Sequence, residues 1–194
     1  MHPPTVDDED ADARQKFQDE AAFASYERAL HVAQRRGDLC AQAAALTNLG
    51  RLYTAYGQVD DALRVYRAAY VCCRRVGDQQ ACARVLTHVA QMWLDVEDFA
   101  QALPVQQRAL ALYHDLRDRW GQAETFMKLG HIHAAMSNVG EALEALHAAL
   151  HQYACLKHRR GQAEVHVGLS RLLQHCGTHE EALHHLTRAQ ALAR

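Results

Sequence analysis

Proline is scarce in this chain of 194 residues, where it occurs only as Pro3, Pro4 and Pro104. Because proline breaks helices, the long stretches between these positions are free to be helical. Aromatic residues are also few, at 7%, although 49% of the residues are hydrophobic, so much of the apolar content is alanine. Alanine has the highest helix propensity and lets helices approach closely. We therefore expect an all-α chain.

The sequence lacks an apolar run of the roughly 20 residues that a membrane-spanning helix needs. Its N-terminus is acidic, where a secretory signal peptide would be basic and then apolar. The six cysteines show no C-x-x-C pair and no framework spacing, which is typical of thiols in a reducing compartment. We expect a cytoplasmic protein that makes no contact with a membrane.

Lysine is nearly absent, since Lys16, Lys128 and Lys157 are the only ones. Residues 1–20 carry seven acids against two bases, whereas the rest of the chain is mildly basic. A nucleic-acid-binding protein usually has a dense stripe of lysine and arginine, so we expect no nucleic-acid partner. The acidic composition predicts a disordered leader over residues 1–10.

The motifs that carry catalysis are also missing. The chain contains no P-loop, no G-x-G-x-x-G, no G-x-S-x-G and no H-E-x-x-H pattern. Serine occurs only three times, without the context of a catalytic triad. We expect no enzymatic activity, no cofactor and no metal.

What the sequence does contain is an internal repeat of 40 residues that aligns without a gap. Each unit has an alanine in its second half that is always followed by leucine. The aligned alanines are Ala62, Ala102, Ala142 and Ala182. The repeats are predicted to span residues 38–77, 78–117, 118–157 and 158–194, after a half-repeat over 11–37, so that the array covers 11–194.

Each repeat has the pattern of two helices. Leu46, Leu49, Gly50 and Tyr53 follow the i, i+3, i+4, i+7 spacing of one helical face, and Ala62 begins a second such face. Glycine-containing segments lie between the two helices and between repeats, where glycine can end a helix in the left-handed conformation. Helix pairs joined by tight turns predict an αα-hairpin solenoid.

The segments Leu46-x2-Leu49-Gly50-x2-Tyr53 and Ala62-x3-Tyr66-x2-Ala69 resemble the tetratricopeptide repeat (TPR) pattern. This resemblance implies a right-handed αα-hairpin superhelix, here with four full repeats and an N-terminal half-repeat. The longer repeat and the Asn-Leu-Gly segment are similar to the arrays of LGN/Pins-type and rapsyn-type scaffolds. The resemblance implies a non-enzymatic scaffold or adaptor that holds a segment of a partner protein in the groove lined by the first helices.

The groove residues are expected to neighbour the core positions of the first helices and to point away from the second helices. By helical spacing they are Asn48, Arg51, Arg84, His88, Gln91, Glu124, Lys128, His131, Glu164 and Arg171. Four of them are basic and two are acidic, which favours a protein or peptide partner with acidic residues. In grooves of the family, the asparagine of Asn-Leu-Gly holds an extended peptide, and here only Asn48 matches it.

Two alternatives stay open. The chain could be a structural subunit or a fragment of a larger assembly, held by its convex face and open ends, with self-association through the C-terminal end. It could also be a pH or metal sensor, because eleven of its 14 histidines lie between His114 and His185 and histidine changes charge near neutrality. His147 and His151 are separated by one helical turn, a spacing compatible with a metal site.

Overall fold

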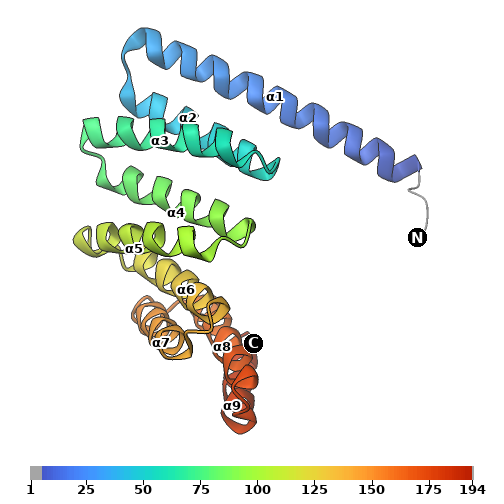
Figure 1. Ribbon diagram of the computed structural model, residues 1–194, viewed down its shortest axis with the longest axis vertical. Coiled ribbons are helices and arrows are strands. Elements are labelled where there is room, and N and C mark those ends of the chain that lie inside the picture. Colours follow the sequence, from blue (N-terminus) through green and yellow to red (C-terminus); the bar gives the residue numbers. More distant parts are fainter. Residues whose placement is uncertain (1–5, 194) are drawn as a thin grey trace. The chain divides into compact units, whose positions relative to one another are not determined.

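The computed structural model describes the backbone of residues 6–193 and the side chains of residues 20–193. Within this range the chain forms helices joined by short turns (Figure 1). The helices are α1 (Val6–Arg36), α2 (Leu39–Ala55), α3 (Val59–Val76), α4 (Gln79–Asp95), α5 (Phe99–Asp115), α6 (Arg119–Ala135), α7 (Val139–Cys155), α8 (Arg159–His175) and α9 (His179–Ala193).

The predicted repeat boundaries coincide with pairs of helices. The pairs α2–α3, α4–α5, α6–α7 and α8–α9 fall within residues 38–77, 78–117, 118–157 and 158–194, respectively. The half-repeat corresponds to α1, which begins at Val6. Residues 6–10 are therefore helical where the acidic composition predicted a disordered leader, and the rest of that prediction, residues 1–5, lies outside the described residues. Acidic residues near a helix N-terminus interact favourably with the helix dipole, so the composition of residues 6–10 is compatible with a helix.

The chain divides into two compact units, residues 1–81 and residues 82–194. In the first unit α1 and α3 pack on α2. In the second unit α6 packs against α5 and α7, and α8 packs against α7 and α9.

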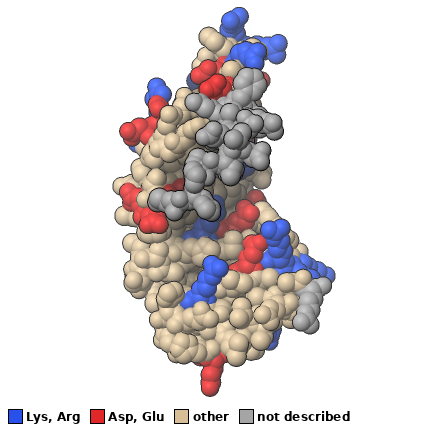
Figure 2. Space-filling model, turned by 90° about the vertical axis from the view of Figure 1, so that its right-hand side faces the viewer, with Lys and Arg blue, Asp and Glu red and all other residues tan. Residues whose placement is uncertain are grey.

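Lysine and arginine side chains are interspersed with acidic ones among many uncharged residues on the face shown in Figure 2.

Side chains at the start of the first helices cap the backbone. The carboxylates of Asp38, Asp78 and Asp118 accept the N–H groups three residues later, at 3.0, 2.8 and 3.0 Å. Such a bond satisfies one of the free N–H groups of a helix start. In the fourth repeat the cap is His158, whose Nδ1 accepts from the N–H of Gly161 at 2.9 Å.

The turns all use a left-handed residue, but only half of them use glycine. Gly37, Gly57, Gly77 and Gly177 have positive φ, as the glycine pattern predicted. The equivalent positions in the other turns hold Glu97, Arg117, Ser137 and Lys157, with φ between 53 and 62°. A side chain in this conformation is strained, so these turns are held by the helices that they join.

Small residues allow the two helices of a repeat to cross closely. A Cβ atom at Gly50 would lie 2.5 Å from the ring of Tyr66, and one at Gly130 would lie 2.6 Å from Cγ of Leu146. Ala62 and Ala142, the alanines of the repeat pattern, are completely buried. The repeated small residues are therefore required by packing.

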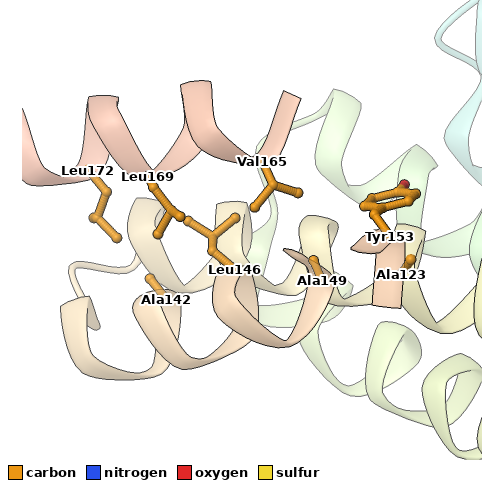
Figure 3. Packing of buried hydrophobic residues seen from close by; sticks show 8 residues of the cluster. All are labelled: Ala123, Ala142, Leu146, Ala149, Tyr153, Val165, Leu169 and Leu172. Atoms are coloured by element: carbon orange, nitrogen blue, oxygen red, sulfur yellow. The ribbon is translucent and has the colours of Figure 1, made fainter. Parts of the chain in front are cut away.

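The core of the last two repeats is shared between α6, α7 and α8. Val165, Leu169 and Leu172 of α8 point toward the side chains of Leu146 and other residues of α7 in Figure 3. At the end of α7, Tyr153 lies above Gly161, where a Cβ atom would come within 2.6 Å of the ring. This packing fixes α8 against α7 and thereby positions the exposed face of α8.

Candidate partner-binding groove between α6 and α8

The second unit contains a groove with a volume of about 870 Å³. Its walls are α6 and α8, and α7 and the turn before it contribute to the floor. Three of the predicted groove residues, His131, Glu164 and Arg171, line it together. The groove is therefore the part of the predicted surface that the structure assembles into one concave site.

The floor of the groove is apolar and is continuous with the core. Leu146 and Leu172 belong to the buried cluster and also line the groove, next to Met127 and Val167. Gly168 leaves this floor open, because a Cβ atom there would make only ordinary contacts of 3.5 Å with Leu146 and His131. The volume above Gly168 can therefore accept an apolar side chain.

The rim carries two charged side chains, Glu164 and Arg171, which differ in their contacts with the described side chains. Arg160 donates to the Glu164 carboxylate at 3.0 Å, which offsets the charge of that acid. Arg171 forms no hydrogen bond or ion pair with the described side chains of residues 20–193. Partial burial lowers the pKa of the neighbouring His131, and the positive charge of Arg171 lowers it further. The net charge that the groove offers to a ligand is therefore positive.

The other predicted residues of the second unit lie on α4 and α6. Arg84 is exposed, and His88 and Gln91 are half-buried, with the Gln91 side chain donating to Asp95 at 2.9 Å. Glu124 and Lys128 are half-buried on α6. Burial lowers the pKa of Lys128, and the nearby carboxylates of Glu124 and Asp95 oppose that shift.

Asn48 and Arg51 lie on α2, in the first unit. Asn48 is half-buried and Arg51 is exposed. They do not line the groove between α6 and α8, and whether they contribute to partner binding stays a prediction.

Sequence reasoning missed part of the groove. Val139 and Leu146 of α7 line it, as do His175 and Cys176 at the end of α8. The prediction considered only the first helices, so it could not include residues of α7. The small residue at Gly168 was a signal of a gap in the floor, since the equivalent positions are Asn48, His88 and Lys128.

No group of three or more histidine, cysteine, aspartate or glutamate side chains with the geometry of a metal site is found among the described residues. His151, one of the two histidines with metal-compatible spacing, lies with Nε2 3.8 Å from the sulfur of Cys155.

No helix in the part of the chain that the structure describes is both long and apolar enough to span a membrane.

Residues 45–80 match the family model for the tetratricopeptide repeat. No curated protein sequence matches the chain. Among solved structures, the chain is similar to BtubC (BKLC) from P. vanneervenii, with a TM-score of 0.83 and 22% identity over 94% of this chain and 76% of that one. A putative kinesin light chain from Podospora anserina with TPR-like repeats has a TM-score of 0.74 and 18% identity, over 92% of this chain and 89% of that one. RapI in its apo form has a TM-score of 0.83 and 16% identity, over 92% of this chain and 50% of that one.

These likenesses confirm the predicted fold class. The chain is an all-α protein of the TPR-like solenoid type, and it contains a segment that matches the tetratricopeptide repeat itself. Arrays of this type stack helical hairpins so that each contacts its neighbours, and they use the resulting extended surfaces for binding.

Proposed function

We propose that the chain is a non-enzymatic interaction module that binds a segment of a partner protein in the groove between α6 and α8. The observation that carries this proposal is the guanidinium of Arg171, which has no side-chain partner among residues 20–193 and lies at the rim of an apolar groove of about 870 Å³. An arginine forms a bidentate, charge-assisted pair with a carboxylate. The partner segment therefore carries an aspartate or glutamate beside an apolar side chain.

The electrostatics of the groove support an acidic partner. Glu164 is already paired with Arg160, so it repels a ligand carboxylate less than an unpaired acid would. His131 stays neutral at pH 7 because its pKa is lowered, and its ring adds a polar but uncharged surface. Arg171 is left as the attractive charge, which sets the orientation of the bound segment.

A random peptide library displayed on phage and selected on the immobilised chain tests the proposal. We expect selected peptides to be enriched in Asp and Glu, and Arg171→Glu to weaken their binding about tenfold or more through the lost charge-assisted pair. Arg119→Glu makes the same charge change on an exposed residue of α6 outside the groove and serves as the matched control. Selection of the same acidic peptides by Arg171→Glu would exclude the groove as the site.

A structural role in an assembly is the second candidate. A hollow of about 640 Å³ between α8 and α9 is lined by Val167, Leu186 and Leu192, among others, and its lining is largely apolar. Apolar surfaces of this kind mark sites of protein association. Light scattering of the wild-type chain and of Leu186→Glu tests this role, because association through this hollow would be lost in the variant.

Two narrower expectations accompany the proposal. The likeness of the Asn-Leu-Gly segment to LGN/Pins-type and rapsyn-type arrays stays a prediction, and so does a cytoplasmic location. A role as a histidine-based pH or metal sensor is a separate alternative. The histidine contacts that bear on it are the His158 cap of α8 and the His166–His185 pair between α8 and α9.

A further inference from the structure

Helix α8 begins at a cap that depends on the protonation of a histidine. His158 Nδ1 accepts the Gly161 N–H at 2.9 Å, so this nitrogen must carry no proton. The equivalent caps Asp38, Asp78 and Asp118 use carboxylates, whose oxygens accept the bond without depending on a tautomer. Imidazole changes its protonation between about pH 5 and 8. Of these four caps, the one at α8 is therefore the one whose hydrogen bond is lost if the acceptor nitrogen gains a proton.

The ring of His158 is half-buried and contacts aromatic side chains of two other helices. The ring centroid of Trp120 on α6 lies 4.7 Å away and that of Tyr153 on α7 lies 5.5 Å away. Tyr153 is the titratable group in contact with the ring, and it is neutral throughout the acid range. Neither neighbour supplies a carboxylate that would compensate a protonated imidazole.

A second contact of α8 also requires an unprotonated ring nitrogen. His166 of α8 and His185 of α9 lie with their Nδ1 atoms 2.9 Å apart. One nitrogen donates and the other accepts, so the pair tolerates one proton on its donor ring but loses the bond when both rings are charged. His166 is only 8% exposed, which leaves little water to solvate the charge.

The groups that face this histidine pair are two further histidines, one arginine and one acid. His147 approaches from α7, and His184 and Arg188 from α9, while Glu181 of α9 is the opposing acid. Burial lowers the pKa of both His166 and His185, and these neighbouring charges lower it further.

The direction of the pH effect follows from these shifts. The unfolded chain binds a proton near pH 6.5, the ordinary pKa of histidine, more readily than the folded pair does. The stability that the pair contributes is therefore complete above about pH 6.5 and falls as the pH drops below that value toward the lowered folded pKa values.

Helix α8 is also a wall of the groove, to which it contributes Glu164, Gly168 and Arg171. We propose that the α8–α9 hairpin is a proton-responsive element, which mild acid loosens through His158 and the His166–His185 pair, so that the groove releases its partner. The release, but not the loosening, rests on the proposed function.

Hydrogen exchange of the full chain without a partner tests the loosening. After correction for intrinsic exchange rates, we expect amides of α8 and α9 to exchange about tenfold faster at pH 5.5 than at pH 7.5. Amides of α2 and α3, where Asp38 is the cap, should keep their protection. Equal protection of α8 and α9 at the two pH values overturns the proposal.

Variants assign the effect to the named histidines. His158→Asp restores the cap of the other repeats, and His185→Gln provides an acceptor for His166 that does not titrate in this range. Both keep a hydrogen-bonding side chain, and the double variant should retain its protection at pH 5.5. His179→Gln, which removes an exposed histidine of α9, should behave like the wild type. A double variant that loosens as much as the wild type contradicts the assignment.

Capture of the library-selected peptides at both pH values then separates the two proposals. We expect wild-type capture at pH 7.5 to fall at least severalfold at pH 5.5, and the double variant to hold the peptides at both. Faster exchange at pH 5.5 without capture at pH 7.5 supports the proton response and overturns the proposed function. Equal wild-type capture at both pH values overturns the release.

Discussion

The side-chain amide of Gln122 donates a hydrogen bond of 3.0 Å to the backbone oxygen of Tyr113 and so joins the third repeat to the second. Gln162 makes the same bond to Tyr153, at 3.3 Å, and Gln42 makes it to Ala33, at 3.3 Å. Each carbonyl also accepts a backbone N–H from the turn that follows its helix, from Asp118, His158 and Asp38, respectively, so the glutamine bond is the second one to that oxygen. The glutamine links therefore add polar contacts to the apolar core at three junctions, from α1 to α2, from α5 to α6 and from α7 to α8.

Replacing Gln122 by alanine should destabilise the chain by about 0.5–1.5 kcal/mol, because the variant loses one hydrogen bond to the Tyr113 carbonyl, which keeps the bond from the Asp118 N–H. Chemical denaturation followed by circular dichroism measures the change. Gln174→Ala, at an exposed position of α8, is the control and should stay within about 0.5 kcal/mol of the wild type. A similar effect of the two substitutions would show that the bond contributes nothing measurable.

The sequence predicted the helix pairs because their determinants are local and periodic. Asp38 and Gly77 mark helix ends through their own backbone and side-chain preferences. Ala62 and the equivalent alanine of each other repeat mark the place where the two helices cross closely. The polar link from Gln122 was not predicted. Glutamine also occurs at the equivalent positions 42 and 162. A polar residue that recurs in a repeat can equally lie on the solvated surface, and the sequence does not show that a backbone carbonyl of the preceding helix accepts its hydrogen bond.

The groove was predicted only in part, for a geometric reason. Helical spacing identifies which residues of α6 and α8 turn away from the core, and it gave His131, Glu164 and Arg171. Helical spacing does not predict where the floor of the groove has room for a ligand side chain. That depends on Gly168 lying over Leu146, which joins two helices from different repeats.

Gln106 is expected to lower the stability of the native protein. It is completely buried on α5, and neither polar atom of its side chain has a hydrogen-bond partner among the described residues. The equivalent position is Leu146 in the next repeat. Because a buried, unsatisfied amide is costly, Gln106→Leu should stabilise the chain by about 1–3 kcal/mol. Thermal unfolding measures this gain, and Gln107→Leu at the exposed neighbouring position should not reproduce it.

Lys157 holds a left-handed conformation, with φ of 53°, at a turn position that is glycine in two other repeats. Lys157→Gly should therefore stabilise the chain by about 1 kcal/mol, after allowance for the greater freedom of glycine in the unfolded state. The reciprocal substitution Gly177→Ala, at φ of 80°, should destabilise it by a comparable amount. Denaturant titrations measure the change in the free energy of unfolding of each variant. Changes of opposite sign support the strain argument, and changes of equal sign contradict it.

Tyr153 should make the chain sensitive to alkali. Burial raises the pKa of its phenol to about 12, and the charges of Glu124 and Glu164 contribute to the same shift. Since the unfolded phenol titrates near pH 10, this stabilisation is complete below about pH 10 and is lost as the pH rises toward 12. Tyr153→Phe should reduce the alkaline loss of stability, measured by circular dichroism, whereas Tyr56→Phe, at a residue 46% exposed, should leave it in place.

Gly130 and Gly168 should respond to substitution in opposite ways, although both line the groove. A Cβ atom at Gly130 would lie 2.6 Å from Leu146, so Gly130→Ala forces the core apart and should cost about 1–3 kcal/mol of stability. At Gly168 the same atom makes ordinary contacts of 3.5 Å, so Gly168→Ala should fold as well as the wild type. Gly168→Leu extends further into the open volume, where it should leave unfolding unchanged within about 1 kcal/mol.

The consequence for binding distinguishes a docking groove from an incidental hollow. If a partner side chain occupies the volume above Gly168, the leucine of Gly168→Leu excludes it, and binding of the selected peptides should weaken about tenfold or more, while Gly168→Ala should keep most of the affinity. Fluorescence anisotropy with labelled peptides measures both. Undiminished affinity of a well-folded Gly168→Leu would mean that no peptide side chain occupies the volume next to Gly168.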